Sequence, residues 1–222
     1  MSRRQVVYLH GLASSPRSSK AAWFGARAGE AGFGFHCPDL NLPAFETLTI
    51  SRMLEEVRAL VAGLPPGPIA LVGSSLGAVV ALFAAEMGAS RPGENPIDRL
   101  ILLAPALDLV PGLTRHFGAT RLDEWRTADA LDVYHYADAR TRRLHWAFFD
   151  DARQYDTTTI RNTLPTLVYQ GRRDTVVDAQ MVSRWASGRP NVTLHLLEDD
   201  HQLLGSLDGI WQGMCEFLAV PA

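Results

Sequence analysis

A serine between two glycines is the residue of this sequence best suited to covalent chemistry. Residues 73–77 read Gly-Ser-Ser-Leu-Gly, with Ser75 at the centre of a Gly-x-Ser-x-Gly pattern. A serine hydroxyl becomes a nucleophile when it is held exposed, near a base and beside donors that can stabilise the developing oxyanion. A sharp strand-to-helix turn provides this setting and requires small residues two positions either side of the serine. The pattern therefore predicts a nucleophile at Ser75.

The residues around the pentapeptide favour such a turn. Residues 68–72 form a short apolar run of strand length, which follows the turn signal Pro65-Pro66-Gly67. The alanine-rich run 78–85 follows and predicts a buried helix that ends near Gly88. A glycine-rich turn in another doubly wound fold is the alternative interpretation.

Two further side chains are placed to complete a catalytic triad. Asp174 follows the apolar run 166–171, and His201 follows the run 192–197. Carboxyl ends of parallel strands meet at the sheet edge where ligands bind. We therefore expect Ser75 as nucleophile, His201 as base and Asp174 as the acid that orients the base. Their chain order, serine, aspartate and histidine, is the order typical of a strand–turn–helix nucleophile.

A second aspartate competes for the role of the acid. Asp108 follows the strand-like run 99–105, which also ends at the expected site edge. The Gly-x-x-Asp-x-x-Val context of residues 171–177 favours Asp174. Asp178 is a candidate cap for the next helix.

The end of the first strand predicts an oxyanion hole. Residues 10–13 read His-Gly-Leu-Ala, and a glycine at position 11 would let the backbone turn toward the site. The N–H of Leu12, or that of Ala13, would then pair with the N–H of Leu76 to bind the oxyanion. His10 is interpreted as a buried structural histidine, because the donors are backbone groups.

Strand-like apolar runs alternate with helical patterns along the chain. This alternation predicts a mostly parallel sheet with helices on both faces, a three-layer α/β/α sandwich of about six strands in one domain over residues 1–222. The expected strands are 5–10, 34–37, 68–72, 99–105, 166–171 and 192–197, and the expected helices are 19–31, 51–62, 78–88 and 207–218.

Residues 106–164 are too long for an ordinary connection in such a fold. We expect them to form a helical, cap-like insertion over the carboxyl ends of the strands. Their aromatic side chains suggest an apolar pocket for an acyl or aryl group, although for any single ring the simpler interpretation is that it anchors the insertion to the core. The aromatics are Phe117, Trp125, Tyr134, Tyr136, Trp146, Phe148, Phe149 and Tyr155.

Composition and charge favour a globular protein without a polyanionic partner. The chain has 222 residues, is 47% hydrophobic and 20% charged, and carries a net charge of −3. The pairs Arg3-Arg4 and Arg142-Arg143 are expected to be solvated rather than to bind nucleic acid. Lys20 is the only lysine, which is typical of GC-rich codon usage and predicts no function.

Cysteine content and hydropathy give expectations about location. Cys37 and Cys215 do not make a disulfide framework. The first strand begins at Gln5, which leaves no room for a signal peptide, and no apolar stretch reaches the length of about 18 residues that suggests a membrane span. We expect a cytoplasmic protein without a membrane partner; its oligomeric state is not predicted.

The residues described so far resemble a known family. Residues 8–21, Tyr-Leu-His-Gly-Leu-Ala-Ser-Ser-Pro-Arg-Ser-Ser-Lys-Ala, are similar to a signature of small bacterial esterases of the YqiA type, within the α/β-hydrolase superfamily. Residues 73–77, 171–174 and His201 match the positions of the nucleophile turn, acid and base in that superfamily. The chain starts at what would be the third strand of the superfamily, which implies a six-stranded sheet without the first two edge strands.

Two departures from the family pattern bear on function. The insertion at 106–164 is longer than in the small esterases, which weakens any transfer of their substrates. Asp200 precedes His201, where the family usually has glycine. A carboxylate there would raise the pKa of His201 if it pointed inward.

The expected activity is hydrolysis of a small-molecule carboxylic ester or thioester through an acyl-enzyme, with no metal or organic cofactor. The same triad could instead cleave amide or carbon–carbon bonds or transfer acyl groups. A non-catalytic binding module is a further alternative, but such relatives usually lack a triad residue. Ser14, Ser15 and Asn41 are expected either to line the rim of the site or to cap and turn the chain.

Overall fold

Six strands form one parallel sheet in the computed structural model, which describes residues 3–89 and 97–219. The sheet order is β2-β1-β3-β4-β7-β8, and every neighbouring pair is parallel. The six predicted strands are confirmed, as is the sheet size that the family resemblance implied. The strands are β1 (Gln5–Leu9), β2 (Gly34–His36), β3 (Ile69–Ser74), β4 (Ile97–Leu103), β7 (Thr166–Gly171) and β8 (Val192–Leu197).

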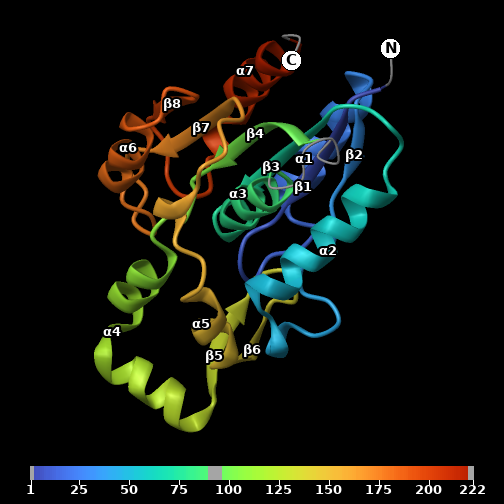
Figure 1. The fold of residues 1–222 in the computed structure, drawn as a ribbon. Coiled ribbons are helices and arrows are strands. Elements are labelled where there is room, and N and C mark those ends of the chain that lie inside the picture. Colours follow the sequence, from blue (N-terminus) through green and yellow to red (C-terminus); the bar gives the residue numbers. More distant parts are fainter. Residues whose placement is uncertain (1–2, 90–96, 220–222) are drawn as a thin grey trace.

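Helices cover both faces of the sheet (Figure 1). One buried cluster joins the sheet to α2 (Ile50–Gly63), α3 (Leu76–Ala89) and α6 (Ala179–Ser187). A second cluster, on the opposite face, joins it to α1 (Ser19–Glu30) and α7 (Leu207–Ala219). Alternate side chains of one strand point to opposite faces of a sheet, so each strand contributes to both clusters. The predicted three-layer α/β/α sandwich is thus confirmed.

The register of the strands brings their carboxyl ends to one edge. Leu9 pairs with Gly73, Ser74 with Leu103, and Gly171 with Leu197. Each of these pairs lies at or next to the last residue of its strands. The loops that leave β1, β3, β7 and β8 therefore begin side by side, and they carry all the predicted site residues.

The insertion is helical only in part. It contains α4 (Leu109–Ala128), an antiparallel hairpin of β5 (Ala130–His135) and β6 (Arg140–His145), α5 (Ala147–Ala152) and the short 3-10 helix η2 (Thr157–Thr159). Asp129 ends α4 in a left-handed conformation with φ 55°. In β5 the side chains alternate between buried and exposed positions, which is the strand period rather than the helix period. The prediction of an all-helical insertion is wrong for this hairpin.

Polar and aromatic contacts attach the hairpin to the loops after β1 and β2. The N–H of Tyr136 donates to the carbonyl of Ala13 at 2.9 Å. The guanidinium of Arg142 donates to both carboxylate oxygens of Glu46, at 2.9 and 2.8 Å. The Arg142 side chain is only 19% exposed, so the prediction that it is solvated is wrong. Through Tyr136, the hairpin lies against the loop that leaves the carboxyl end of β1.

Most aromatic residues of the insertion anchor it, as the simpler interpretation held. Trp125, Phe148 and Phe149 are buried, and the indole N–H of Trp125 donates to the carbonyl of Leu144 at 2.8 Å. Tyr134 and Tyr136 differ, since they are 51% and 74% exposed and pack edge to face against each other.

Two other expectations concern the rest of the chain. Cys37 and Cys215 are both free thiols. Within residues 3–89 and 97–219, no helix is both long enough and apolar enough to cross a membrane.

Candidate active site

Ser75 lies in the predicted turn between β3 and α3. Its φ is 53°, a left-handed value that is strained for a residue with a side chain. Its N–H donates to the carbonyl of Leu103 at 2.9 Å, which ties the turn to β4. A Cβ on Gly73 would collide with the backbone of Gly77 and Ala78, and one on Gly77 would collide with the carbonyls of Leu9 and His10. The two glycines thus let the start of α3 pack directly on the sheet, with Ser75 at the apex of the turn between β3 and α3.

The structure brings the three predicted triad side chains into one hydrogen-bonded chain. Oγ of Ser75 lies 3.2 Å from Nε2 of His201, and Nδ1 of His201 lies 2.8 Å from Oδ2 of Asp174. The His201 side chain is 17% exposed, whereas that of Asp174 is fully buried. In this arrangement the imidazole can take the proton of the hydroxyl, while the buried acid holds the imidazole in place.

The Asp174 carboxylate is held from every side. Its Oδ1 accepts the N–H groups of Val176 and Val177, each at 2.8 Å. Its Oδ2 accepts the side-chain amide of Gln170 at 2.9 Å as well as the imidazole of His201. Burial raises the pKa of Asp174, but the hydrogen bonds from His201 and Val177 outweigh burial, so the pKa lies below its ordinary value. The carboxylate is therefore ionised at neutral pH.

The competing aspartates have other partners. Asp108 stands at the start of α4 and forms an ion pair with Arg115. The Asp200 carboxylate is exposed and accepts the N–H of Gln202 at 2.8 Å, so it does not point inward at the base. Asp178 caps α6, since it accepts the N–H of Gln180 at 2.9 Å.

His10 is buried and orients the backbone next to Ser75. Nε2 of His10 accepts the N–H of Leu40 at 3.0 Å, which assigns the ring proton to Nδ1. Nδ1 then donates to the carbonyl of Gly11 at 2.9 Å. The C=O and N–H of a trans peptide point in opposite directions, so the N–H of Leu12 points away from His10. His10 therefore has the structural role expected of it.

The loop after β1 lies directly against Ser75, although for a different reason from the one predicted. Gly11 is not among the residues with positive φ; the left-handed residue of this loop is Ala13, with φ 57°. A Cβ on Gly11 would lie 3.3 Å from Cβ of Ser75, so glycine serves close approach rather than a turn. Within the described parts of the chain, neither the N–H of Leu12 nor that of Leu76 has a hydrogen-bond acceptor. The prediction that they bind an oxyanion requires such unpaired donors.

The sequence reasoning missed two buried polar residues behind the site. Gln170 is fully buried at the end of β7 and positions Asp174. Lys20 is 9% exposed, and its Nζ donates to Oγ of Ser74 at 3.0 Å. A signal for Lys20 existed, because it shares the buried stripe of α1 with Phe24 and Ala28 at helical spacing.

The candidate rim residues mainly shape loops. Asn41 donates from its amide to the carbonyl of Ser14 and to the carboxylate of Asp39, both at 2.8 Å. The hydroxyl of Ser15 accepts the N–H of Arg17 at 3.1 Å. These contacts correspond to the alternative of capping and turning the chain.

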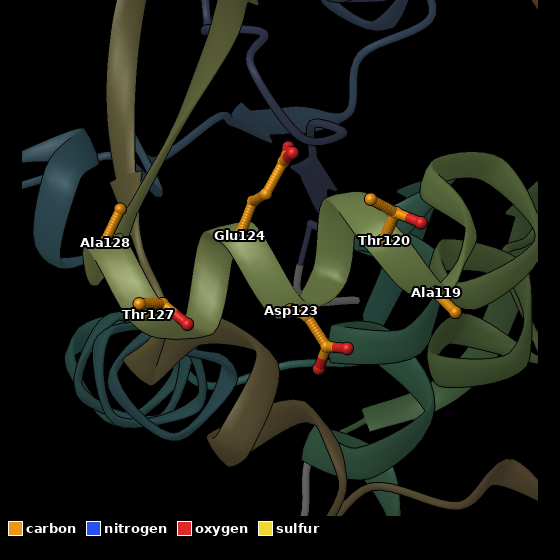
Figure 2. A pocket seen from close by; sticks show the side chains of 6 residues that line it. All are labelled: Ala119, Thr120, Asp123, Glu124, Thr127 and Ala128. Carbon is orange, nitrogen blue, oxygen red and sulfur yellow. The ribbon is translucent and has the colours of Figure 1, made fainter.

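Two surface hollows lie elsewhere. One has a volume of about 590 Å³ and lies along the second half of α4. Its lining side chains are Ala119, Thr120, Asp123, Glu124, Thr127 and Ala128 (Figure 2). The other is lined by residues of β7, β8 and α7, among them Tyr169 and His195. Neither includes Ser75, Asp174 or His201. No cluster of His, Cys, Asp and Glu suited to a metal ion occurs in the described part of the chain.

Comparison with solved structures identifies the fold. The chain is 25% identical to a candidate hydrolase from Agrobacterium vitis S4, with a TM-score of 0.86 over 96% of this chain and 87% of that one. It is 21% identical to Est1E from Butyrivibrio proteoclasticus, solved with ferulic acid bound, with a TM-score of 0.80 and coverage of 97% and 90%. It is 22% identical to the mouse α/β-hydrolase domain-containing protein 10, with a TM-score of 0.75 and coverage of 96% and 87%.

The sequence comparisons assign the family. No curated protein sequence matches the chain. Residues 5–218 match the family described as an uncharacterised protein family, UPF0227. The match spans nearly the whole chain, and the structural neighbours are hydrolases, esterases and lipases of the superfamily that the opening motif resembles. This protein therefore belongs to the UPF0227 family and has the α/β-hydrolase fold.

Proposed function

We propose that this protein is a serine esterase that hydrolyses carboxylic esters or thioesters of small molecules. The observation that carries the proposal is the chain of contacts from Ser75 Oγ to His201 Nε2 at 3.2 Å and from His201 Nδ1 to Asp174 Oδ2 at 2.8 Å. Nucleophile, base and orienting acid are all present, which argues against the non-catalytic alternative. The esterases and lipases among the structural neighbours support ester hydrolysis as the general class of reaction.

In the proposed mechanism, Ser75 Oγ attacks the acyl carbon while His201 Nε2 takes the hydroxyl proton. Asp174 keeps the imidazole in the tautomer that has its proton on Nδ1 and stabilises the imidazolium that forms. The N–H groups of Leu12 and Leu76 stabilise the oxyanion of the tetrahedral intermediate, and one such donor is worth about 3 kcal/mol. His201 then gives its proton to the leaving alcohol or thiol. A water molecule, activated by the same imidazole, releases the acid.

Covalent labelling tests the proposal. A fluorophosphonate probe should label the wild-type protein at Ser75, and Ser75→Ala should abolish both labelling and turnover of p-nitrophenyl acetate. Ser183→Ala is a matched control, because that hydroxyl only bonds the carbonyl of Ala179 within α6; it should label at the wild-type rate. Labelling that persists in Ser75→Ala would refute the assignment.

The bond that is cleaved needs a separate comparison. A panel of short-chain esters, thioesters and amides should show turnover of the esters or thioesters with a clear acyl-length preference. Turnover confined to the amides would assign the same triad to another reaction.

A further inference from the structure

The only lysine of the chain lies buried beside the proposed nucleophile. Lys20 reaches from α1 to β3, and its Nζ donates to Oγ of Ser74, the residue that precedes Ser75, at 3.0 Å. The side chain is 9% exposed, and the ammonium has no carboxylate within ion-pair distance in the described part of the chain. The buried phenol of Tyr8 lies near the same hydroxyl. The hydroxyl of Ser74 is thus held by a buried cation, next to the turn that carries Ser75.

The position of this ammonium is unfavourable for the fold. Burial removes a charge from water, and the second residue of α1 lies at the positive end of the helix dipole, where cations are disfavoured. A methionine or leucine would satisfy the buried stripe of α1 without either penalty. A residue that breaks local rules in this way, next to a reactive group, points to a functional reason.

The surrounding charges indicate what that reason is. Asp174, Asp199 and Asp200 each favour the charged form of Lys20 electrostatically. All three carboxylates lie on the loops that carry the acid and the base. Burial nevertheless lowers the pKa of Lys20 to about 8, and it raises the pKa of the neighbouring Tyr8 phenol and of the Cys37 thiol. Lys20 is therefore the group of this cluster whose charge changes in the mildly alkaline range.

We propose that Lys20 is a positioning residue for the reaction at Ser75, an inference that rests on the proposed esterase function. Its charged hydrogen bond holds Ser74 and so fixes the strained turn at Ser75. Its positive charge attracts Asp174, Asp199 and Asp200 over a longer range and so restrains the loops that carry the acid and the base. Charge-assisted hydrogen bonds are stronger than neutral ones, so both effects weaken when the ammonium loses its proton.

The test is the rate of fluorophosphonate labelling of Ser75 between pH 6 and pH 10. The wild-type rate should fall above the pKa of Lys20, about 8. Lys20→Met should label about tenfold more slowly at pH 7, because a displaced turn misaligns the nucleophile, and it should show no further fall above pH 8. Lys20→Arg should recover most of the neutral rate and keep it to higher pH, since a guanidinium stays protonated. Arg17→Met, which removes an exposed charge from the preceding loop, should behave like the wild type.

The outcomes separate this inference from the esterase proposal. Absence of wild-type labelling at Ser75 would refute the esterase and with it the role of Lys20. Labelling at Ser75 with a Lys20→Met rate equal to wild type, or with the same alkaline fall in Lys20→Met, would refute the role of Lys20 alone. If Lys20→Met does not fold, the Lys20→Arg profile decides, and an alkaline fall at the wild-type pH in that variant overturns the inference.

Discussion

Among single residues, Asp174 is distinguished by having all of its hydrogen-bonding capacity in use. An ionised carboxylate has about four acceptor sites. Asp174 fills them with the N–H groups of Val176 and Val177, the amide of Gln170 and the imidazole of His201. Every one of these partners is a donor. The position therefore requires a group that only accepts, which an isosteric amide is not.

Replacing Asp174 by asparagine is expected to lower kcat by a factor of about 10³–10⁴. The new amide N–H₂ would face donors, so His201 would turn its unprotonated Nδ1 toward it and lose the tautomer that activates Ser75. Steady-state kinetics on p-nitrophenyl acetate measure the change. Asp108→Asn is the control, because Asp108 pairs with Arg115 rather than with His201, and its kcat should stay near the wild-type value. A larger loss in Asp108→Asn would assign the acid to Asp108.

The residues of the proposed triad could be picked out from the sequence because each of them follows a strand. Ser75, Asp174 and His201 each follow an apolar run, and parallel strands bring such positions to one edge whatever the details of packing. The choice between Asp174 and Asp108 rested on context alone, because the ion pair of Asp108 with Arg115 forms only in the folded chain. Lys20 and Ser74 are 54 positions apart, so nothing local marks their contact.

Among the elements, the turn into α3 depends most on glycine. Position 77 admits no Cβ, because the carbonyls of Leu9 and His10 occupy that space. These are backbone atoms at and just after the end of β1, which cannot rotate away as a side chain would. The absence of a side chain at position 77 is therefore needed both for α3 to pack on the sheet and for the turn at Ser75 to form.

Gly77→Ala is expected to destabilise the protein by about 3 kcal/mol or to prevent folding, since overpacking against backbone forces α3 away from the sheet. Gly209→Ala is the control: nothing lies near a Cβ at that position of α7, and alanine should stabilise the helix by about 0.5–1 kcal/mol. Urea unfolding compares both with the wild type. Equal stability of Gly77→Ala and wild type would contradict the close packing of α3 on β1.

The β5–β6 hairpin was not predicted, because residues 106–164 were interpreted as one insertion from their length and aromatic content, and neither property distinguishes strands from helices. Its alternation is clear only once Asp132 and Tyr134 are seen to face solvent and Leu131 to face the core. The consequence for function lies at its tip. There, Tyr136 binds the loop of Ala13 through its backbone and leaves its ring exposed.

The double variant Tyr134→Ser, Tyr136→Ser is expected to raise KM for aryl or long-chain acyl esters about fivefold, because each lost ring contact is worth about 1 kcal/mol or less. Acetyl esters, whose acyl group offers little apolar surface to these rings, should keep their KM. Met87→Ser on α3, also 48% exposed, is the control and should alter neither value. An unchanged KM across the ester panel would remove the hairpin from the binding site.

For the molecule as a whole, the two faces of the sheet serve different purposes. The face of α2, α3 and α6 carries the larger apolar cluster, together with buried residues of the insertion. The face of α1 and α7 includes Leu203 and Leu207, so the segment just after His201 packs there. Lys20 belongs to the α1 layer of that second face. Because Lys20 is buried in that layer, the free energy of unfolding of the whole protein should depend on whether Lys20 is protonated.

The pKa of Lys20 is about 8 in the folded chain against an ordinary value of 10.5, so folding disfavours its proton. Between these two pH values the unfolded chain holds the proton and the folded chain does not, and stability must rise with pH in that window. Below pH 8 the full penalty applies. It amounts to at most about 3 kcal/mol, and Lys20→Met should therefore be at least as stable as wild type at pH 7 despite labelling more slowly.

Urea unfolding of both proteins at pH 7 and pH 10 tests this expectation, since contributions from all other groups cancel in the difference between them. The unfolding free energy of the wild type should increase relative to Lys20→Met by up to about 3 kcal/mol across that range. If the difference in unfolding free energy between the two proteins did not change with pH, folding would not lower the pKa of Lys20, and the ammonium would be solvated in the folded protein. If Lys20→Met were much less stable than wild type at pH 7, Lys20 would instead be a structural residue. A residue that positions the site at the expense of stability must leave the protein equally or more stable when it is replaced.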